Sequence, residues 1–200
     1  MSREHYMRGK LLYLVGASGS GKDSLLDGCR QRLKPQHGCF VAHRYITRAV
    51  NIGGENHIHL SEDEFEMRVN MGMFAMQWYS HGYSYAVGSE VENWLANGIN
   101  VVMNGSREYL PFAMHSYPNL IPVLVDVNAD VLRERLTKRG REDADEIEAR
   151  LQRHDEIVDT LPDDVRRIDN NGDVQYGVAQ LIKLIEELAP SEVTPSYSTH

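Results

Sequence analysis

Short apolar runs alternate along this chain with longer amphipathic stretches. The first run, Lys10–Val15 (KLLYLV), ends at Gly16 and predicts a buried parallel strand. Similar runs at Cys39–Ala42, Ile99–Met103 and Ile121–Val127 predict three more strands. Their continuous apolar character, without polar alternation, is typical of strands that are covered on both faces.

Helical periodicity follows most of these runs. Leu25, Leu26, Cys29 and Leu33 recur at helical spacing, which predicts a helix over 22–33 that ends before Pro35. Further helices are expected over Glu90–Ala96, Asp130–Arg139, Asp143–Val158 and Val174–Leu188. Strands that alternate with helices predict an α/β fold built on a parallel sheet.

One segment breaks this rhythm. The stretch His43–Gly88 is rich in Arg, His, Tyr and Met and has no long apolar strand. We interpret it as part of an inserted substrate-binding sub-domain with small strands and a short helix over Glu62–Arg68. A single domain over 1–200 is therefore expected, with its core at 10–42 and 99–188, an insertion at 43–98, a lid at about 139–153 and a flexible tail at 189–200.

Composition narrows the functional class. The 200 residues carry a net charge of −8, which argues against a general nucleic-acid binder. Of the 21 basic residues 16 are Arg, a bias that suits phosphate binding, although lineage bias explains the ratio as well. The two cysteines, Cys29 and Cys39, lack metal or redox spacing, and no stretch resembles a signal peptide or membrane span. A reduced, cytoplasmic protein without membrane or nucleic-acid partners is expected; its oligomeric state stays open.

The segment after the first strand predicts a phosphate-binding loop. It reads GASGSGKDS, follows a strand and opens a helix. Glycines let the backbone N–H groups point at phosphate oxygens, and the helix N-terminus adds positive potential. The expected ATP-binding residues are Gly16, Ala17, Ser18, Gly19, Ser20, Gly21, Lys22, Asp23 and Ser24. The alternative, a simple Gly/Ser-rich turn, leaves Lys22 at this position unexplained.

Asp23 departs from the usual pattern of this loop. It stands where a Ser or Thr hydroxyl normally binds Mg²⁺. A carboxylate is a good ligand for Mg²⁺, directly or through water, so Asp23 is the expected metal residue. The alternative is an acidic residue that favours the first turn of a helix.

The ordered motifs resemble the guanylate kinase-like branch of the P-loop kinases. They are GASGSGKDSLL (16–26), ITR (46–48), GE followed by HIHLSEDEF (54–65), HGYSYAV (81–87), RLTKRG (135–140) and DNN (169–171). The resemblance covers about Lys10–Leu188. It implies a P-loop NTPase three-layer sandwich with a parallel sheet, an inserted substrate-binding sub-domain and a lid.

The resemblance fails at the positions that read guanine in that family. Gln77 matches the family's Glu, Val87 matches its Thr, and Met103–Arg107 replaces the segment that helps to hold the base. Losing a carboxylate and a hydroxyl while gaining Arg107 favours a smaller substrate with an additional anionic group.

These departures are similar to those of the ribose 1,5-bisphosphate phosphokinase family. The shared segments are GKDSL (21–25), AHRYITR (42–48), GGENHI (53–58), YAVG (85–88), MNGSR (103–107) and RGRE (139–142). The resemblance implies that ATP phosphorylates ribose 1,5-bisphosphate to 5-phosphoribosyl 1-diphosphate, in phosphonate catabolism and phosphoribosyl diphosphate supply. A nucleoside monophosphate kinase and a non-catalytic binding module are the alternatives.

The resemblance also implies roles for basic residues. Lys22, Arg139 and Arg150 are expected to be catalytic. Arg44, Arg48, Tyr85, Asn104 and Arg107 are expected to bind the substrate, and Arg141 and Arg153 are weaker candidates. A phosphate acceptor is already nucleophilic near neutral pH, so no general base is required.

Two other groups of side chains are not expected to bind a ligand. Met71, Met73 and Met76 are expected to pack in the core or at a hinge. His57 and His59 lack a third ligand, so a metal role for them is a weak hypothesis.

Overall fold

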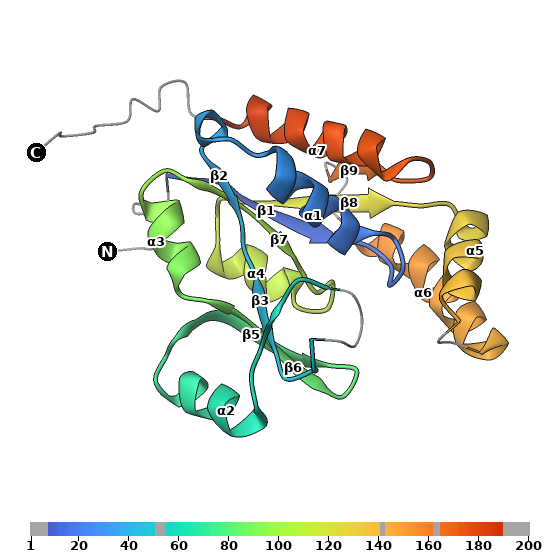
Figure 1. The fold of residues 1–200 in the computed structure, drawn as a ribbon, viewed down its shortest axis with the longest axis horizontal. Coiled ribbons are helices and arrows are strands. Elements are labelled where there is room, and N and C mark those ends of the chain that lie inside the picture. The colour runs from blue at the N-terminus through green and yellow to red at the C-terminus, as the bar shows by residue number, and fades with distance from the viewer. Residues whose placement is uncertain (1–7, 51–54, 141–142, 162–164, 190–200) are drawn as a thin grey trace, which may run out of the picture.

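The computed structural model describes residues 8–50, 55–140, 143–161 and 165–189, and in the last turns of its long sixth helix only the backbone. Its centre is a five-stranded parallel sheet (Figure 1). In spatial order the strands are β2 (Cys39–Val41), β7 (Asn100–Asn104), β1 (Leu11–Val15), β8 (Leu120–Asp126) and β9 (Arg166–Asp169). The central strand β1 is fully buried, as its apolar sequence predicts.

Helices cover both faces of this sheet. Odd-numbered residues of β1 belong to a core with α3 (Glu90–Ala96) and α4 (Leu110–Ser116). Even-numbered residues of β1 belong to a second core with α1 (Lys22–Arg32) and α7 (Val174–Glu187). Because side chains alternate across a strand, these two cores make a three-layer α/β sandwich.

The part of the chain between β2 and α3 forms a second sheet. Its strand order is β4 (Ile58–His59), β3 (Arg44–Ile46), β6 (Tyr83–Gly88) and β5 (Phe74–Ser80). Helix α2 (Glu62–Asn70) begins at Ser61, whose hydroxyl accepts from the Glu64 N–H at 3.2 Å. Phe65 of α2 packs on Leu60 and Ala86, which gives this sheet its own small core.

Helices α5 (Ala129–Arg139) and α6 (Ala144–Thr160) form a pair beyond the carboxyl end of β8 (Figure 1). Leu132 and Leu136 of α5 pack with Ile147 and Leu151 of α6. A reciprocal capping box between Asp143 and Glu146 starts α6.

The predicted strands and helices of the central sandwich are present, with ends that differ by at most two residues. Three of the described elements were not predicted, and one of them is the short 3-10 helix η2 (Pro35–His37). Strand β9 has the polar sequence RRID, of which only Ile168 is buried, because it lies at the edge of the sheet. Helix α4 has only 7 residues and carries Pro111 in its first turn. It is too short for apolar residues to repeat at helical spacing, so the sequence did not predict it.

The methionine interpretation was wrong in two of three positions. Met76 is buried in the core, whereas Met71 and Met73 are 70% and 46% exposed. They follow the end of α2 around a turn at Gly72, and so lie on the surface. Within the described ranges, no helix is long and apolar enough to cross a membrane.

Candidate active site

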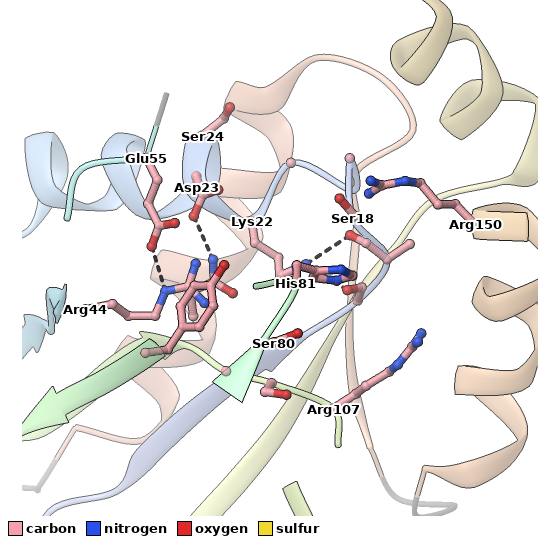
Figure 2. A pocket seen from close by; sticks show the side chains of 18 of the residues that line it. Ser18, Lys22, Asp23, Ser24, Arg44, Glu55, Ser80, His81, Arg107 and Arg150 are labelled. Atoms are coloured by element: carbon pink, nitrogen blue, oxygen red, sulfur yellow. Dashed lines mark hydrogen bonds and ion pairs between the residues drawn. The ribbon is translucent and has the colours of Figure 1, made fainter. Parts of the chain in front are cut away.

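A pocket of about 450 Å³ opens at the carboxyl ends of β1 and β7. The β5–β6 hairpin and the helices α5 and α6 supply its other walls. In Figure 2, Lys22 lies between the Arg44–Glu55 pair on one side and Arg150 on the other. The basic side chains that line it are Lys22, Arg44, Arg48, Arg107, Arg135, Arg139 and Arg150. The fold therefore gathers side chains from five separate segments around one polar cavity.

The phosphate loop forms the floor of this pocket. Gly19 and Gly21 have φ angles of 93° and 91°, which side chains rarely adopt. A Cβ at Gly21 would also lie 2.4 Å from the Asn170 amide nitrogen. Of the nine predicted ATP-binding residues, all but Ser20 line the pocket. Ser20 is fully buried, and its carbonyl accepts from Asn170 at 2.7 Å, so it stabilises the loop from behind.

Lys22 is held by the loop that it belongs to. Its ammonium donates to the carbonyl oxygens of Gly16 at 2.7 Å and Ala17 at 2.9 Å. An ammonium has three protons, so one remains for a phosphate oxygen. Burial lowers the pKa of Lys22 to about 8, an effect that neighbouring Asp23 partly offsets. A bound polyanion would favour the charged form.

Asp23 meets Asn104 across the floor of the pocket. The Asn104 amide nitrogen donates to the Asp23 carboxylate at 2.6 Å. Asn104 is only 4% exposed, and its carbonyl oxygen has no hydrogen-bond donor among the described residues. A carboxylate oxygen and an unpaired amide oxygen are thus held close together, and both are ligands that Mg²⁺ prefers.

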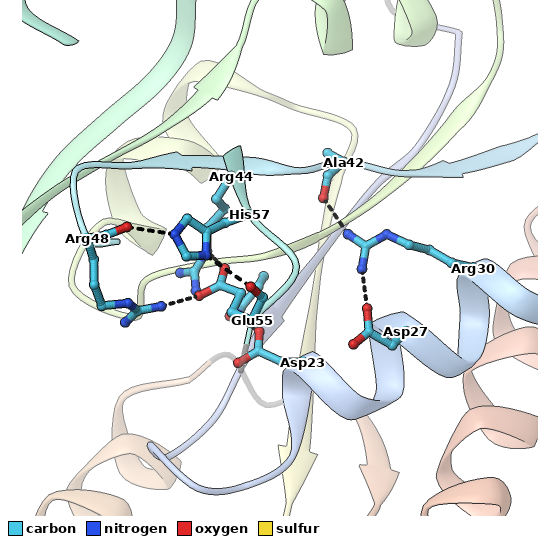
Figure 3. A network of polar contacts seen from close by, with 9 residues as sticks. Asp23, Asp27, Arg30, Ala42, Arg44, Arg48, Glu55 and His57 are labelled. Atoms are coloured by element: carbon cyan, nitrogen blue, oxygen red, sulfur yellow. Dashed lines mark hydrogen bonds and ion pairs between the residues drawn. The ribbon is translucent and has the colours of Figure 1, made fainter. Parts of the chain in front are cut away.

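Two arginines at the other end of the pocket share one buried carboxylate (Figure 3). Glu55 accepts from Arg44 at 2.6 Å and from Arg48 at 3.0 Å. All three side chains are largely buried, with 12%, 17% and 8% exposure for Arg44, Arg48 and Glu55. Burial raises the pKa of Glu55, but Arg44 and then Arg48 lower it more, so the carboxyl is ionised at neutral pH. The cluster keeps one net positive charge.

The histidines near this cluster have a structural role. His57 is buried, and its ring nitrogens lie 2.8 Å from the Arg48 carbonyl oxygen and 3.0 Å from that of Glu55. His59 also approaches the Arg48 carbonyl, at 3.2 Å. Within the described part of the chain, no three His, Cys, Asp or Glu side chains could together hold a metal ion. These contacts account for His57 and His59 without a metal.

Aromatic rings continue from the arginine pair into the wall of the pocket. The Arg44 guanidinium lies 5.1 Å from the centroid of the Tyr85 ring. Tyr85 in turn stacks on Trp78, and both rings line the pocket. Burial raises the pKa of Tyr85, so its hydroxyl stays a neutral donor for a substrate oxygen.

The remaining arginines come from three directions. Arg107 follows β7 and is about a third exposed, with its guanidinium 3.9 Å from the Glu108 carboxylate. Arg139 at the end of α5 is exposed, and Arg150 of α6 is half-buried. Arg141 and the side chain of Arg153 lie outside the described residues.

Sequence reasoning missed three charged residues of the lining. One is Glu55, which follows the glycine pair of GGENHI. Another is Glu108, which directly follows MNGSR and is 69% exposed. The third is Arg135, which opens RLTKRG. Arg135 donates to the Asn170 carbonyl at 2.8 Å, and its second terminal nitrogen is buried without a partner among the described residues. Glu55 and Arg135 lie within these motifs, and that position was the signal that could have identified them as site residues.

Known proteins place the chain in a family, although no family model matches it. It is 50% identical over 178 residues to ribose 1,5-bisphosphate phosphokinase PhnN of Desulfomicrobium baculatum, covering 89% of this chain and 95% of that protein. It is 46% identical over 187 residues to the protein of the same name from Psychromonas ingrahamii, covering 94% and 95%. The chain belongs to the ribose 1,5-bisphosphate phosphokinase family.

The fold of this family member is that of a guanylate kinase. The crystal structure of guanylate kinase from Anaplasma phagocytophilum superimposes with a TM-score of 0.67, covering 92% of this chain and 89% of that one. Sequence identity over this match is 14%, so the likeness concerns the fold alone. The predicted three-layer, guanylate kinase-like P-loop fold is confirmed.

The sequence comparison at Gln77 needs correction. Gln77 is exposed and does not line the pocket, because alternation along β5 turns Met76, Trp78 and Ser80 to the other face. Val87 is fully buried in the core and does not line the pocket either. The inward positions of β5 carry apolar, aromatic and hydroxyl groups and no carboxylate. That the site lacks an acceptor for a base stays a prediction.

Proposed function

We infer that this protein transfers the γ-phosphoryl group of ATP to the 1-phosphate of ribose 1,5-bisphosphate, which gives ADP and 5-phosphoribosyl 1-diphosphate. The observation that carries the proposal is a pocket with basic groups at two ends. The phosphate loop and Lys22 form one end, and Arg44 and Arg48 form the other. The close relatives carry the name of this activity.

The residues of the pocket suit a reaction that needs positioning and charge neutralisation. The acceptor phosphate is already a nucleophile, because its second pKa is near 6. Lys22 would neutralise charge on the transferring group from the loop side, and Arg139 and Arg150 from the helical side. Arg44, Arg48, Tyr85, Asn104 and Arg107 would hold the sugar bisphosphate. Among the described residues that line the acceptor end, Glu55 is the buried carboxylate; two arginines engage it, and it is not required as a base.

Segments 43–98 and 139–153 have distinct tasks in this proposal. The first is an inserted substrate-binding unit, and its strands β3, β5 and β6 supply the acceptor end of the pocket. The second is a lid that brings Arg139 and Arg150 to the phosphates. Closure of a lid excludes water from the reaction. We place the reaction in the cytoplasm, in phosphoribosyl diphosphate supply and phosphonate catabolism.

Mg²⁺ is the metal that the site fits. Asp23 and the unpaired carbonyl oxygen of Asn104 would hold it, directly or through water. When bound, Mg²⁺ neutralises charge on the β- and γ-phosphates. The Asn104 amide nitrogen holds the Asp23 carboxylate toward the carboxyl end of β7.

An acceptor panel tests the proposed function. Release of ADP from ATP is measured with ribose 1,5-bisphosphate, GMP, AMP, UMP and CMP as acceptors. We expect rapid turnover with the sugar bisphosphate and little with the nucleotides. Efficient GMP phosphorylation would instead support a nucleoside monophosphate kinase, and absence of turnover with every acceptor would support a binding module.

Replacing Asp23 by alanine should raise the Mg²⁺ concentration needed for half-maximal activity about tenfold or more, the usual effect of disturbing a metal site. Titration of Mn²⁺ into the protein with ADP, followed by electron paramagnetic resonance, should show the same weakening. Asp27→Ala is the matched control, since Asp27 lies one turn later on α1 and pairs with Arg30 at 2.7 Å. Unchanged titrations would return Asp23 to the role of a helix-start residue.

Replacing Arg107 by alanine should weaken use of ribose 1,5-bisphosphate roughly tenfold, the lower part of the range for a charged hydrogen bond, because the side chain is a third exposed. Ribose 1-phosphate should lose much less, since the partner of Arg107 is already missing. The measurement is kcat/KM for both acceptors with wild type and variant. Arg133→Ala is the control, because Arg133 is an arginine of α5 that does not line the pocket.

Equal losses on the two acceptors would show that Arg107 does not bind the second phosphate. A loss confined to the KM for ATP would place Arg107 on the donor side instead.

A further inference from the structure

Three aromatic rings form a stack beside the acceptor end of the pocket. Trp78 stacks with both Tyr85 and Tyr109, with ring centroids 5.8 Å and 5.6 Å from its own. The Trp78 and Tyr85 rings are parallel to within 4°, and the Trp78 and Tyr109 rings to within 29°. Trp78 and Tyr85 are paired residues of β5 and β6, whereas Tyr109 comes from the segment before α4. The stack is therefore assembled by the tertiary fold.

The middle ring of this stack has the size of a nucleobase. An indole is a flat, fused five- and six-membered ring system, as a purine is. Proteins bind bases by stacking them on aromatic rings, with no need for a particular sequence of hydrogen bonds. Tyr85 and Tyr109 each offer such a face, and the Trp78 indole of the chain itself already stacks on both.

The stack adjoins the proposed phosphate-binding arginines. Arg44 lies 5.1 Å from the centre of the Tyr85 ring, on a side chain that Glu55 holds in place. Trp78, Tyr85 and Arg44 all line the same pocket. If a nucleoside monophosphate bound with its phosphate at Arg44, its base would extend toward the space that the Trp78 indole already fills.

We propose that the Trp78 indole occupies the position of a base in the acceptor site and so excludes nucleoside monophosphates, leaving room for a sugar phosphate. Trp78 is then a specificity-determining residue rather than a catalytic one. This inference rests on the proposed function, because it assumes that the acceptor phosphate binds at Arg44 and Arg48. It assigns the exclusion of bases to a steric block, in addition to the missing hydrogen-bond partners.

Removal of the indole provides the test. GMP and AMP binding is measured by calorimetry, without ATP, for wild type, Trp78→Ala, Trp78→Val and Trp78→Phe. We expect no measurable binding by wild type, at least a tenfold gain in affinity for the Ala and Val variants, and a smaller gain for Phe, which keeps one ring. Free indole should fill the vacated space and compete with GMP in the Ala and Val variants.

Trp94→Ala is the matched control. Trp94 is the other tryptophan of the chain and packs against Phe40 outside the pocket, with ring centroids 5.2 Å apart and ring planes tilted by 58°. It loses the same ring and should gain no affinity for GMP. Affinity for ATP reports whether each variant keeps its fold, and Trp78→Phe is the substitution that disturbs packing least.

The outcomes separate this inference from the proposed function. Failure of wild type to use ribose 1,5-bisphosphate would contradict the proposed function, whatever the variants bind. Folded Trp78 variants, including Trp78→Phe, that bind ATP normally and show no gain for GMP or AMP would overturn the steric block. A gain that Trp94→Ala shares, or that indole does not compete away, would overturn it as well.

Discussion

Replacing Lys22 by alanine is expected to lower kcat by roughly 10²–10³-fold, the usual loss when one preorganised charge is removed from a transition state. Lys22 is partly buried at the floor of the pocket, and its ammonium is fixed by the carbonyl oxygens of Gly16 and Ala17. The measurement is kcat in an ADP-release assay with saturating ATP and ribose 1,5-bisphosphate. Lys183→Ala is the control, because that side chain is 78% exposed on α7.

The same variant should keep a cooperative fold. Burial lowers the pKa of Lys22 to about 8 from an ordinary 10.5, so burying the ammonium disfavours folding below about pH 8. This penalty decreases as the pH rises from 8 toward 10.5. Over that range the folded protein loses the Lys22 proton, whereas the unfolded chain still binds it. Wild type should therefore gain stability relative to Lys22→Ala across this window.

Near-normal kcat in the Lys22→Ala variant would contradict the role of the phosphate loop.

Replacing Glu55 by glutamine is expected to lower the free energy of unfolding by about 3 kcal/mol. Removing one partner of a buried ion pair leaves an uncompensated charge, and here two guanidinium groups lose their carboxylate. Urea unfolding of wild type and variant measures the difference. Glu64→Gln is the control: its pair with Arg68 is as short, at 2.7 Å, but Glu64 is 42% exposed, so a loss below about 1 kcal/mol is expected.

The Glu55 contribution should depend on pH in a defined direction. Arg44 and Arg48 outweigh burial and lower the pKa of Glu55 below its ordinary 4.5. A carboxyl with a lowered folded-state pKa stabilises the protein above its ordinary pKa, and the effect disappears as the pH falls through the folded-state value. The difference between wild type and Glu55→Gln should therefore be constant from neutral pH to about 4.5 and shrink below it. A constant difference down to pH 3 would show that Glu55 acts through packing alone.

Local sequence was sufficient for the elements that depend on neighbouring residues. The apolar run of β1, the glycines of the phosphate loop and the start of α1 lie within one continuous stretch, and each follows from short-range backbone chemistry. The alternation of strands and helices also predicted the parallel sheet, because parallel strands need crossover connections. Motif resemblance added the fold family and most of the pocket residues.

Strand faces and long-range partners were decided by the tertiary structure. Gln77 and Met76 are adjacent in sequence, and only the register of β5 against β6 shows which of them faces inward. Asn104 reaches Asp23 across 81 positions, and Tyr109 comes from beyond β7 to close the stack on Trp78. These contacts join segments whose separation in sequence carries no local signal. Their geometry exists only after the hydrophobic cores have packed the two sheets and their helices together, since packing rather than propensity sets distances between remote side chains.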